Sequence, residues 1–187
     1  MKKVEYLFER NKIETLNYKG VLDFKSEYLM LLHDNPFPDP PKSGSFHQVI
    51  RYLKRKDQSQ ELKIGPYGNI SVFEAANRIA SDLVIINGLL QLVEKNIEFK
   101  QALFTLRLGT THIAGKGDFT IFFNGKELEG EAFNVAPSYL KPKMRNTIKK
   151  WKDSQQLKYI LVNEEAFEFI GASKIDERVF TVKNWHE

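Results

Sequence analysis

The sequence contains no cysteine among its 187 residues. Structural disulfides, thiol nucleophiles, iron–sulfur clusters and thiolate zinc sites are therefore excluded. The chain also lacks the long apolar run of a membrane span, and no apolar segment follows its N-terminal lysines as it would in a signal peptide. These absences predict a cytoplasmic protein with no membrane partner.

Several common catalytic signatures are missing as well. The chain has no Gly-x-x-x-x-Gly-Lys-Ser/Thr phosphate loop, no Rossmann fingerprint and no Gly-x-Ser-x-Gly elbow. Nucleotide hydrolysis by a P-loop and serine hydrolase chemistry are therefore disfavoured. What is present is a globular composition, with 42% hydrophobic and 28% charged residues. At about 100 to 200 residues per domain, the length predicts a single domain spanning residues 1–187.

Positive charge is in modest excess and is grouped along the chain. The formal net charge is +4, and between positions 141 and 158 seven basic residues stand against one acidic residue, Asp153. Such a group is typical of a surface that binds a polyanion, and equally of a helix face that is simply solvated. Both interpretations stay open at this point.

The N-terminal third is rich in turn signals. Four prolines between positions 36 and 41 exclude regular structure there, which indicates a loop or an arm. We expect a strand or short helix over 18–32 and a helix over 47–56. Residues 1–62 are interpreted as an N-terminal extension available for DNA or dimer contacts.

Clearer periodic patterns follow from position 71. The expected elements are a helix over 71–94, a strand over 101–108, hairpin strands over 118–123 and 126–135, a helix over 140–151, a strand over 158–162 and further edge strands within 167–185. Pro142 is compatible with its helix only in the first turn. The order helix, strand, strand, strand, helix, strand predicts a mixed α/β or α+β sheet with helices packed against it.

The hairpin places three acidic residues on one face. A two-residue turn at Asn124 and Gly125 sets Thr120 opposite Glu129, and Asp118 opposite Glu131. Because side chains alternate along a strand, Asp118, Glu129 and Glu131 project together. Opposed carboxylates repel unless a proton or cation lies between them, and Mg²⁺ takes oxygen ligands of this kind. The acids therefore predict either a metal site for phosphodiester hydrolysis or an ordinary solvated strand face.

Gly117-Asp118, Glu129-Gly-Glu131 in the next strand, and this order of elements resemble the PD-(D/E)XK core of restriction-endonuclease-like nucleases. The resemblance covers residues 71–162 and implies a central mixed sheet with helices on both sides. It implies that Asp118 and Glu129 hold one or two Mg²⁺ (or Mn²⁺) ions. Glu131 stands where the family usually has lysine, and is expected to assist as metal ligand or general base.

Because that lysine is absent, its role is expected to fall to another residue. The candidates for support are Lys116, Lys143, Lys149 and Glu74. Glu74 has two interpretations, as the capping-box partner in Ser71-x-x-Glu74 or as the extra metal-linked acid that some nucleases of the family carry. The expected nucleic-acid contacts along the basic helix are Lys141, Lys143, Arg145, Lys149 and Lys152.

These observations give three hypotheses. The first is a Mg²⁺-dependent endonuclease that cuts DNA, as a homodimer like most restriction-type enzymes. The second is a non-catalytic module with a nuclease-like fold that binds nucleic acid or a protein. The third is an immunity or regulatory protein unrelated to nucleic acid, which would not bind DNA near physiological salt.

Overall fold

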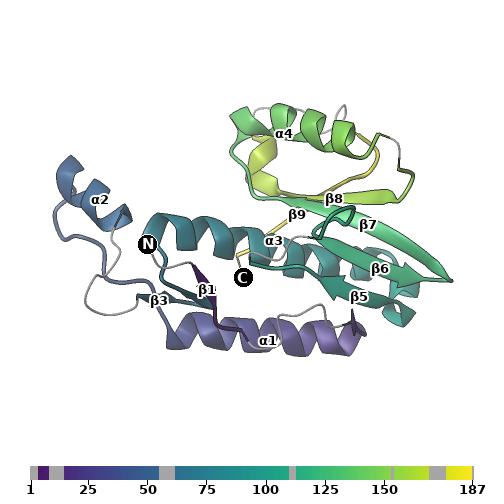
Figure 1. The fold of residues 1–187 in the computed structure, drawn as a ribbon, viewed down its shortest axis with the longest axis horizontal. Coiled ribbons are helices and arrows are strands. Elements are labelled where there is room, and N and C mark those ends of the chain that lie inside the picture. The colour runs from purple at the N-terminus through teal and green to yellow at the C-terminus, as the bar shows by residue number, and fades with distance from the viewer. Residues whose placement is uncertain are drawn as a thin grey trace.

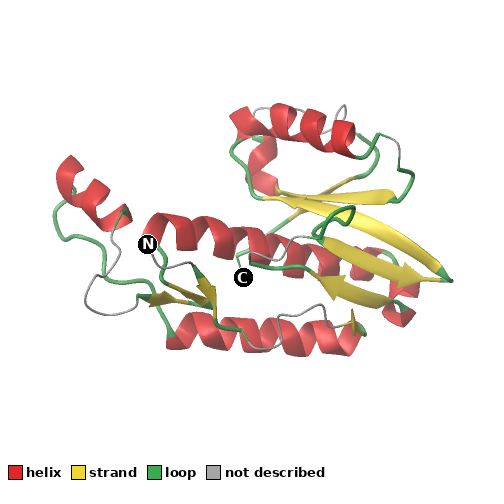
Figure 2. Ribbon diagram, viewed as in Figure 1, coloured by secondary structure: helices red, strands yellow, loops and turns green. Residues whose placement is uncertain are grey.

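A six-stranded mixed sheet forms the centre of the molecule, in the order β2-β5-β6-β7-β8-β9. The computed structural model describes residues 4–8, 15–54, 62–109, 113–152, 154–168 and 176–186. Helices α3 and α1 lie on one side of the sheet and α4 lies on the other (Figure 1). A small antiparallel sheet, β1-β4-β3, lies beside α3 (Figure 2). The prediction of a mixed sheet flanked by helices is confirmed.

The elements have the following bounds. The helices are α1 Tyr18–Asp34, α2 Phe46–Leu53, α3 Val72–Lys95 and α4 Pro137–Lys150, with short 3-10 helices η1 Ile97–Gln101 and η2 Glu164–Phe167. The strands are β1 Glu5–Tyr6, β2 Thr15–Leu16, β3 Lys63–Ile64, β4 Tyr67–Gly68, β5 Leu103–Leu106, β6 Phe119–Phe123, β7 Lys126–Phe133, β8 Leu157–Asn163 and β9 Val179–Val182.

The hairpin of β6 and β7 has the predicted register. Phe123 pairs with Lys126 and Thr120 pairs with Glu129 in an antiparallel ladder. Asn124 and Gly125 both have positive φ, as a tight two-residue turn requires. β8 then joins β7 in parallel, after the crossover through α4, and β9 joins β8 in parallel at the edge. The chain order from α3 to β8 is therefore the one expected from the sequence.

Two apolar clusters hold the layers together. On one face of the sheet, Phe119 and Ile121 pack into the cluster that contains the buried side of α3. On the other face, Phe133 packs with Leu140 and Met144 of α4 and with β8. Because both faces of the central strands are covered, the polar side chains on the α4 side are taken out of water.

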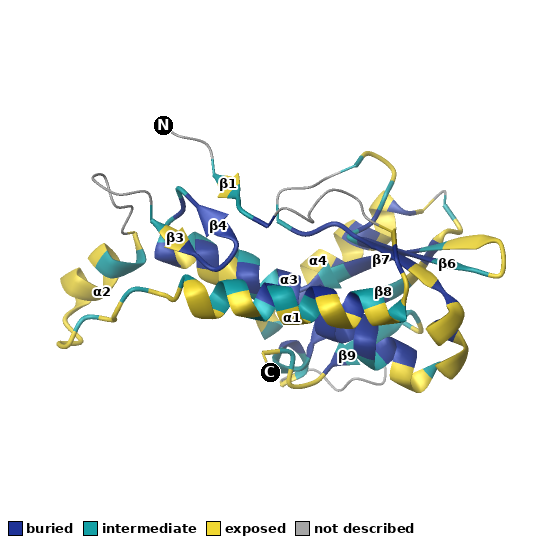
Figure 3. Cartoon of the chain, turned by 90° about the horizontal axis from the view of Figure 1, so that it is seen from below, coloured by how far each residue is buried: buried dark blue, intermediate teal, exposed yellow. Residues whose placement is uncertain are grey.

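The N-terminal part differs from its interpretation as an extension. Residues 18–34 form a 17-residue helix, longer than expected, whose Phe24 and Tyr28 are buried in the same cluster as α3. β2 pairs with β5 and so extends the main sheet. Within 15–54, only α2 lacks buried residues, and Figure 3 shows it exposed at one end of the molecule. Most of the described N-terminal residues therefore belong to the body of the protein.

The position of Pro142 in its helix differs from the prediction. The expectation that Pro142 lies in a first turn was wrong, because α4 begins at Pro137 and Pro142 lies inside it. Proline lacks an N–H to donate, and the apolar contacts of Leu140 and Met144 hold this turn in place.

Among the residues that the structure describes, no helix is both long enough and apolar enough to cross a membrane.

Candidate functional site

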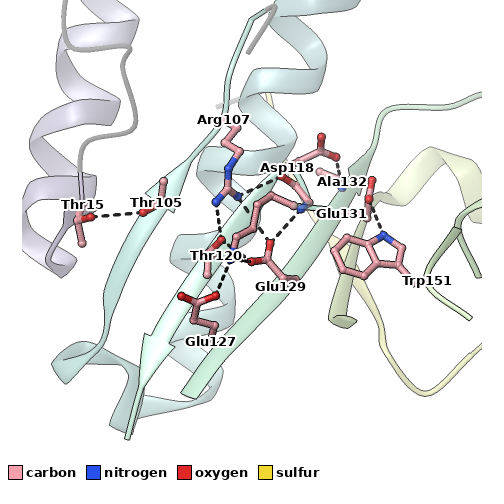
Figure 4. A network of polar contacts seen from close by, with 12 residues as sticks. Thr15, Thr105, Arg107, Asp118, Thr120, Glu127, Glu129, Glu131, Ala132 and Trp151 are labelled. Atoms are coloured by element: carbon pink, nitrogen blue, oxygen red, sulfur yellow. Dashed lines mark hydrogen bonds and ion pairs between the residues drawn. The ribbon is translucent and has the colours of Figure 1, made fainter. Parts of the chain in front are cut away.

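The sheet face toward α4 carries a group of buried polar side chains on neighbouring strands. The buried members are Thr105, Arg107, Thr120, Glu129 and Glu131, and half-buried Asp118 directly precedes β6. Five polar side chains buried on one face are unusual unless each finds partners. Thr105 lies with its hydroxyl 3.5 Å from that of Thr15, and the others divide into two adjoining sets (Figure 4).

The first set is the acid pair, which consists of Asp118 and Glu131. Oδ2 of Asp118 accepts a hydrogen bond of 2.8 Å from the backbone N–H of Ala132. Burial, and next the charge of Glu131, raise the pKa of Asp118 to about 6. The Ala132 N–H and the charges of Lys143 and Lys150 act in the opposite direction. The two carboxyl groups are thus like charges close together in a poorly solvated place, which is the arrangement that raises such a pKa.

Glu131 is fixed by the end of α4. Its Oε1 accepts hydrogen bonds of 2.7 Å from Lys150 Nζ and 2.7 Å from Trp151 Nε1. The side chain of Lys150 is 43% exposed, so one end of this contact reaches solvent. Lys143 lies on the same face of the helix as Lys150. Its ammonium is 5.1 Å from the centre of the Phe133 ring. Helix α4 therefore brings two lysines to the acid pair.

The second set surrounds Glu129, which is completely buried. Oε2 accepts a 2.9 Å hydrogen bond from the Gly117 N–H and lies 3.7 Å from Arg107 Nη1. Oε1 accepts from Thr120 Oγ1 at 3.0 Å and lies 3.1 Å from Lys116 Nζ. Lys116 also binds Glu127, and these two acids raise the pKa of its ammonium. Both oxygens of Glu129 are thus engaged by groups of the protein.

The structure therefore brings together two of the three predicted acids. Asp118 and Glu131 interact, whereas Glu129 makes its contacts with the other set. Within the described residues, no three His, Cys, Asp or Glu side chains form a group that could hold a metal ion.

The acid pair nevertheless has a donor set that suits Mg²⁺ or Mn²⁺. Oδ1 of Asp118 and Oε2 of Glu131 accept no hydrogen bond from any described residue. Mg²⁺ usually binds one or two carboxylates and completes its octahedron with water and substrate phosphate. Two carboxylate oxygens without a protein donor therefore fit the ion in kind and in number.

The remaining predicted residues lie apart from the pair. Ser71 accepts a hydrogen bond from the Glu74 N–H, which confirms a cap at the start of α3, and the Glu74 carboxylate binds Arg78 at 2.9 Å. Lys149 is exposed on α4. Lys141, Arg145 and Lys152 of the predicted stripe are exposed as well, as is Lys143.

Sequence reasoning missed Lys150, Trp151 and Arg107 as members of the site. A signal for Lys150 was present, because Lys143 and Lys150 are seven residues apart and so share one helix face after two turns. Trp151 and Arg107 had no comparable signal, since their partners are distant in the chain.

No family model, curated protein or solved structure matches the chain. The function is therefore argued from the acid pair and its surroundings.

Proposed function

We propose that the protein is a metal-dependent phosphodiesterase that cuts DNA, with a restriction-endonuclease-like core. The observation that carries the proposal is the acid pair. Asp118 directly precedes β6 and Glu131 lies on the neighbouring β7; the pKa of Asp118 is raised, and two lysines of the following helix act on the pair. Paired acids with a lysine beside them are a donor set for a metal ion and a scissile phosphate.

The residues have distinct roles in this proposal. Mg²⁺ or Mn²⁺ supplies charge neutralisation and water activation when bound. Asp118 and Glu131 hold the ion through the oxygens that lack a protein donor. Lys150, which binds Glu131, would supply positive charge to a phosphate bound at the ion, and Lys143 would add a second positive charge. The lysine that the sequence motif lacks is thus provided by α4.

The order of elements supports the same proposal. The hairpin β6–β7, the crossover helix α4 and the parallel strand β8 follow α3 in the arrangement that the resemblance implies. The chain departs from the motif in one respect, because Glu131 rather than Glu129 is the partner of Asp118. We place DNA along the exposed basic residues of α4, and a homodimer would present two such sites to the two strands.

A second candidate is a non-catalytic module that binds nucleic acid through α4. It is favoured by the 2.7 Å contact of Lys150 with Glu131, which already gives that carboxylate a positive partner. In that case DNA binding depends on salt but is unchanged by Mg²⁺.

The test is cleavage of supercoiled plasmid and single-stranded DNA with Mg²⁺ or Mn²⁺. The parent is expected to cut, and Asp118→Asn to lower the rate by about 100-fold or more, because a lost metal ligand removes several kcal/mol of transition-state stabilisation. Asp23→Asn, at an exposed position on α1, is the matched control and should cut like the parent. Equal cutting by Asp118→Asn would contradict the proposal.

A further inference from the structure

Gly117, which directly precedes Asp118, is held through both of its backbone polar groups. Its N–H donates to Glu129 Oε2 at 2.9 Å, and its carbonyl oxygen accepts from Arg107 Nη1 at 3.1 Å. The backbone N–H of Arg107 also donates to the carbonyl of Asp118 at 2.9 Å. Both peptide groups that flank the Asp118 Cα are therefore attached to Arg107.

The backbone at Gly117 also lies unusually close to β7. A Cβ placed on Gly117 would lie 2.2 Å from the carbonyl oxygen of Gly130, and a Cβ on Gly130 would lie 2.0 Å from the Phe119 ring. Neither residue has space for a side chain. This close approach accounts for the glycine in Glu129-Gly-Glu131, and it places the Gly117 N–H within reach of Glu129.

The groups that hold Gly117 are themselves buried and interconnected. The Arg107 side chain is only 4% exposed, and its Nη2 donates to Thr120 Oγ1 at 2.7 Å. Thr120 donates in turn to Glu129. A buried arginine and glutamate of this kind are inaccessible to DNA and keep their geometry as a unit.

We propose that Glu129 and Arg107 are positioning residues, which fix the Gly117–Asp118 backbone and so direct the Asp118 carboxylate toward Glu131. Glu129 occupies the motif position of a metal ligand, but its two oxygens serve the backbone, Thr120 and the basic side chains. The catalytic consequence rests on the proposed function. The structural part of the inference, that this pair holds Gly117, can be tested without any metal or DNA.

The main variant replaces both members of the buried pair, as Arg107→Met with Glu129→Leu. Replacing both partners with apolar residues of similar size avoids leaving one charge unpaired, so folding is retained. Glu129→Gln serves as the conservative second variant, because it keeps the shape and removes the charge.

The first measurement is hydrogen exchange of the Gly117 amide, followed by NMR. In the double variant we expect the Gly117 amide to exchange at least about tenfold faster. The amide of Ile121, in the middle of β6, is the internal control and should be unaffected. Unchanged exchange at Gly117 overturns the inference, whether or not the parent cuts DNA.

The second measurement separates positioning from metal ligation. Loss of a supporting partner is expected to lower the cleavage rate about 10- to 100-fold in both variants. The fall should be mainly in kcat, with a smaller change in KM. Mn²⁺ affinity, followed by electron paramagnetic resonance, should fall less than in Asp118→Asn, because both carboxylates that hold the ion are still present. A loss of Mn²⁺ affinity in Glu129→Gln as large as that in Asp118→Asn overturns the inference. A parent that neither binds Mn²⁺ nor cuts contradicts the proposed function, and the exchange measurement alone then decides the inference.

Discussion

The ion pair between Lys150 and Glu131 is the residue-level contact that most directly tests the site. Lys150 lowers the pKa of Asp118 and binds Glu131. Lys150→Met should therefore raise the Asp118 pKa above about 6, shift the pH profile of cleavage upward and reduce the rate about 10-fold or more. Lys19→Met changes an exposed lysine of α1 and is the matched control. If both variants cut equally, Lys150 has no special role.

The protonation of Asp118 predicts how metal affinity depends on pH. Metal binding needs the carboxylate, and burial beside Glu131 keeps Asp118 protonated up to about pH 6. Mn²⁺ affinity should therefore rise by about tenfold per pH unit below that value and level off above it. A calorimetric titration at several pH values measures this. An affinity that stays flat down to pH 5 would contradict the assigned pKa.

At the scale of elements, the contact of α3 with the sheet depends on a glycine. A Cβ on Gly88 would lie 2.7 Å from Leu161 of β8 and 2.8 Å from Val182 of β9. Gly88→Ala gains about 1 kcal/mol of helix propensity, but overpacking costs about 1–3 kcal/mol. We expect a net loss of about 1 kcal/mol in urea unfolding. Gly44→Ala, where the added Cβ meets nothing, is the control, and a more stable Gly88→Ala would show that the sheet moves away freely.

The exposed face of α4 gives a second prediction at this scale. Lys149 and Lys152 are exposed and make no hydrogen bond to the acid pair. If they contact phosphates, changing both to glutamine should weaken DNA binding and lower the slope of log Kd against log salt by about 0.9 per lysine. Lys19→Gln with Lys63→Gln, exposed on other elements, is the control. Equal slopes in all three proteins would show that DNA does not lie along α4.

At the scale of the whole molecule, Asp82 of α3 joins the N-terminal elements to the core. Its carboxylate accepts hydrogen bonds from Tyr28 of α1 at 2.8 Å, Tyr67 of β4 at 2.6 Å and the Gly109 N–H at 3.1 Å. Burial raises the pKa of Asp82 from 3.8 to about 6, although these hydrogen bonds and Arg78 lower it. The interior thus carries a carboxyl group that titrates near neutrality.

This group makes the stability of the protein depend on pH. Because the folded pKa is the higher one, the stabilisation is complete below pH 3.8 and is lost as pH rises through about 6. The difference corresponds to roughly 3 kcal/mol. The free energy of unfolding of the parent, minus that of Asp82→Asn, should therefore be larger at about pH 4 than at pH 7 by most of that amount, because Asp82 of the unfolded chain is already partly ionised at pH 4. The titration of Asp118 contributes equally to both proteins and cancels from this difference. For Asp23→Asn, the difference from the parent should not change with pH in this way.

Patterns of residues close together in the chain predicted the β6–β7 hairpin, but they did not predict how the N-terminal part packs. The register of β6 and β7 depends on Asn124, Gly125 and alternation within 16 residues, all of which are adjacent in the chain. The cap at Ser71 is equally local. By contrast, Tyr28 is buried because Asp82 and Tyr67 lie beside it, and β2 exists because β5 pairs with it. No short-range pattern contains those partners.

The sequence by itself determined the absence of thiol chemistry, the order of elements from α3 to β8, and the placement of three acids on one strand face, because these depend on composition and on side-chain periodicity. Only the tertiary structure decided that Lys150 and Trp151 bind Glu131 while Glu129 holds the backbone of Gly117. That division depends on how closely the loop before β6 approaches β7 and on where α4 ends, with Lys150 and Trp151 directed at one acid. Such contacts depend on the distances between segments far apart in the chain. The packing of the whole molecule determines those distances.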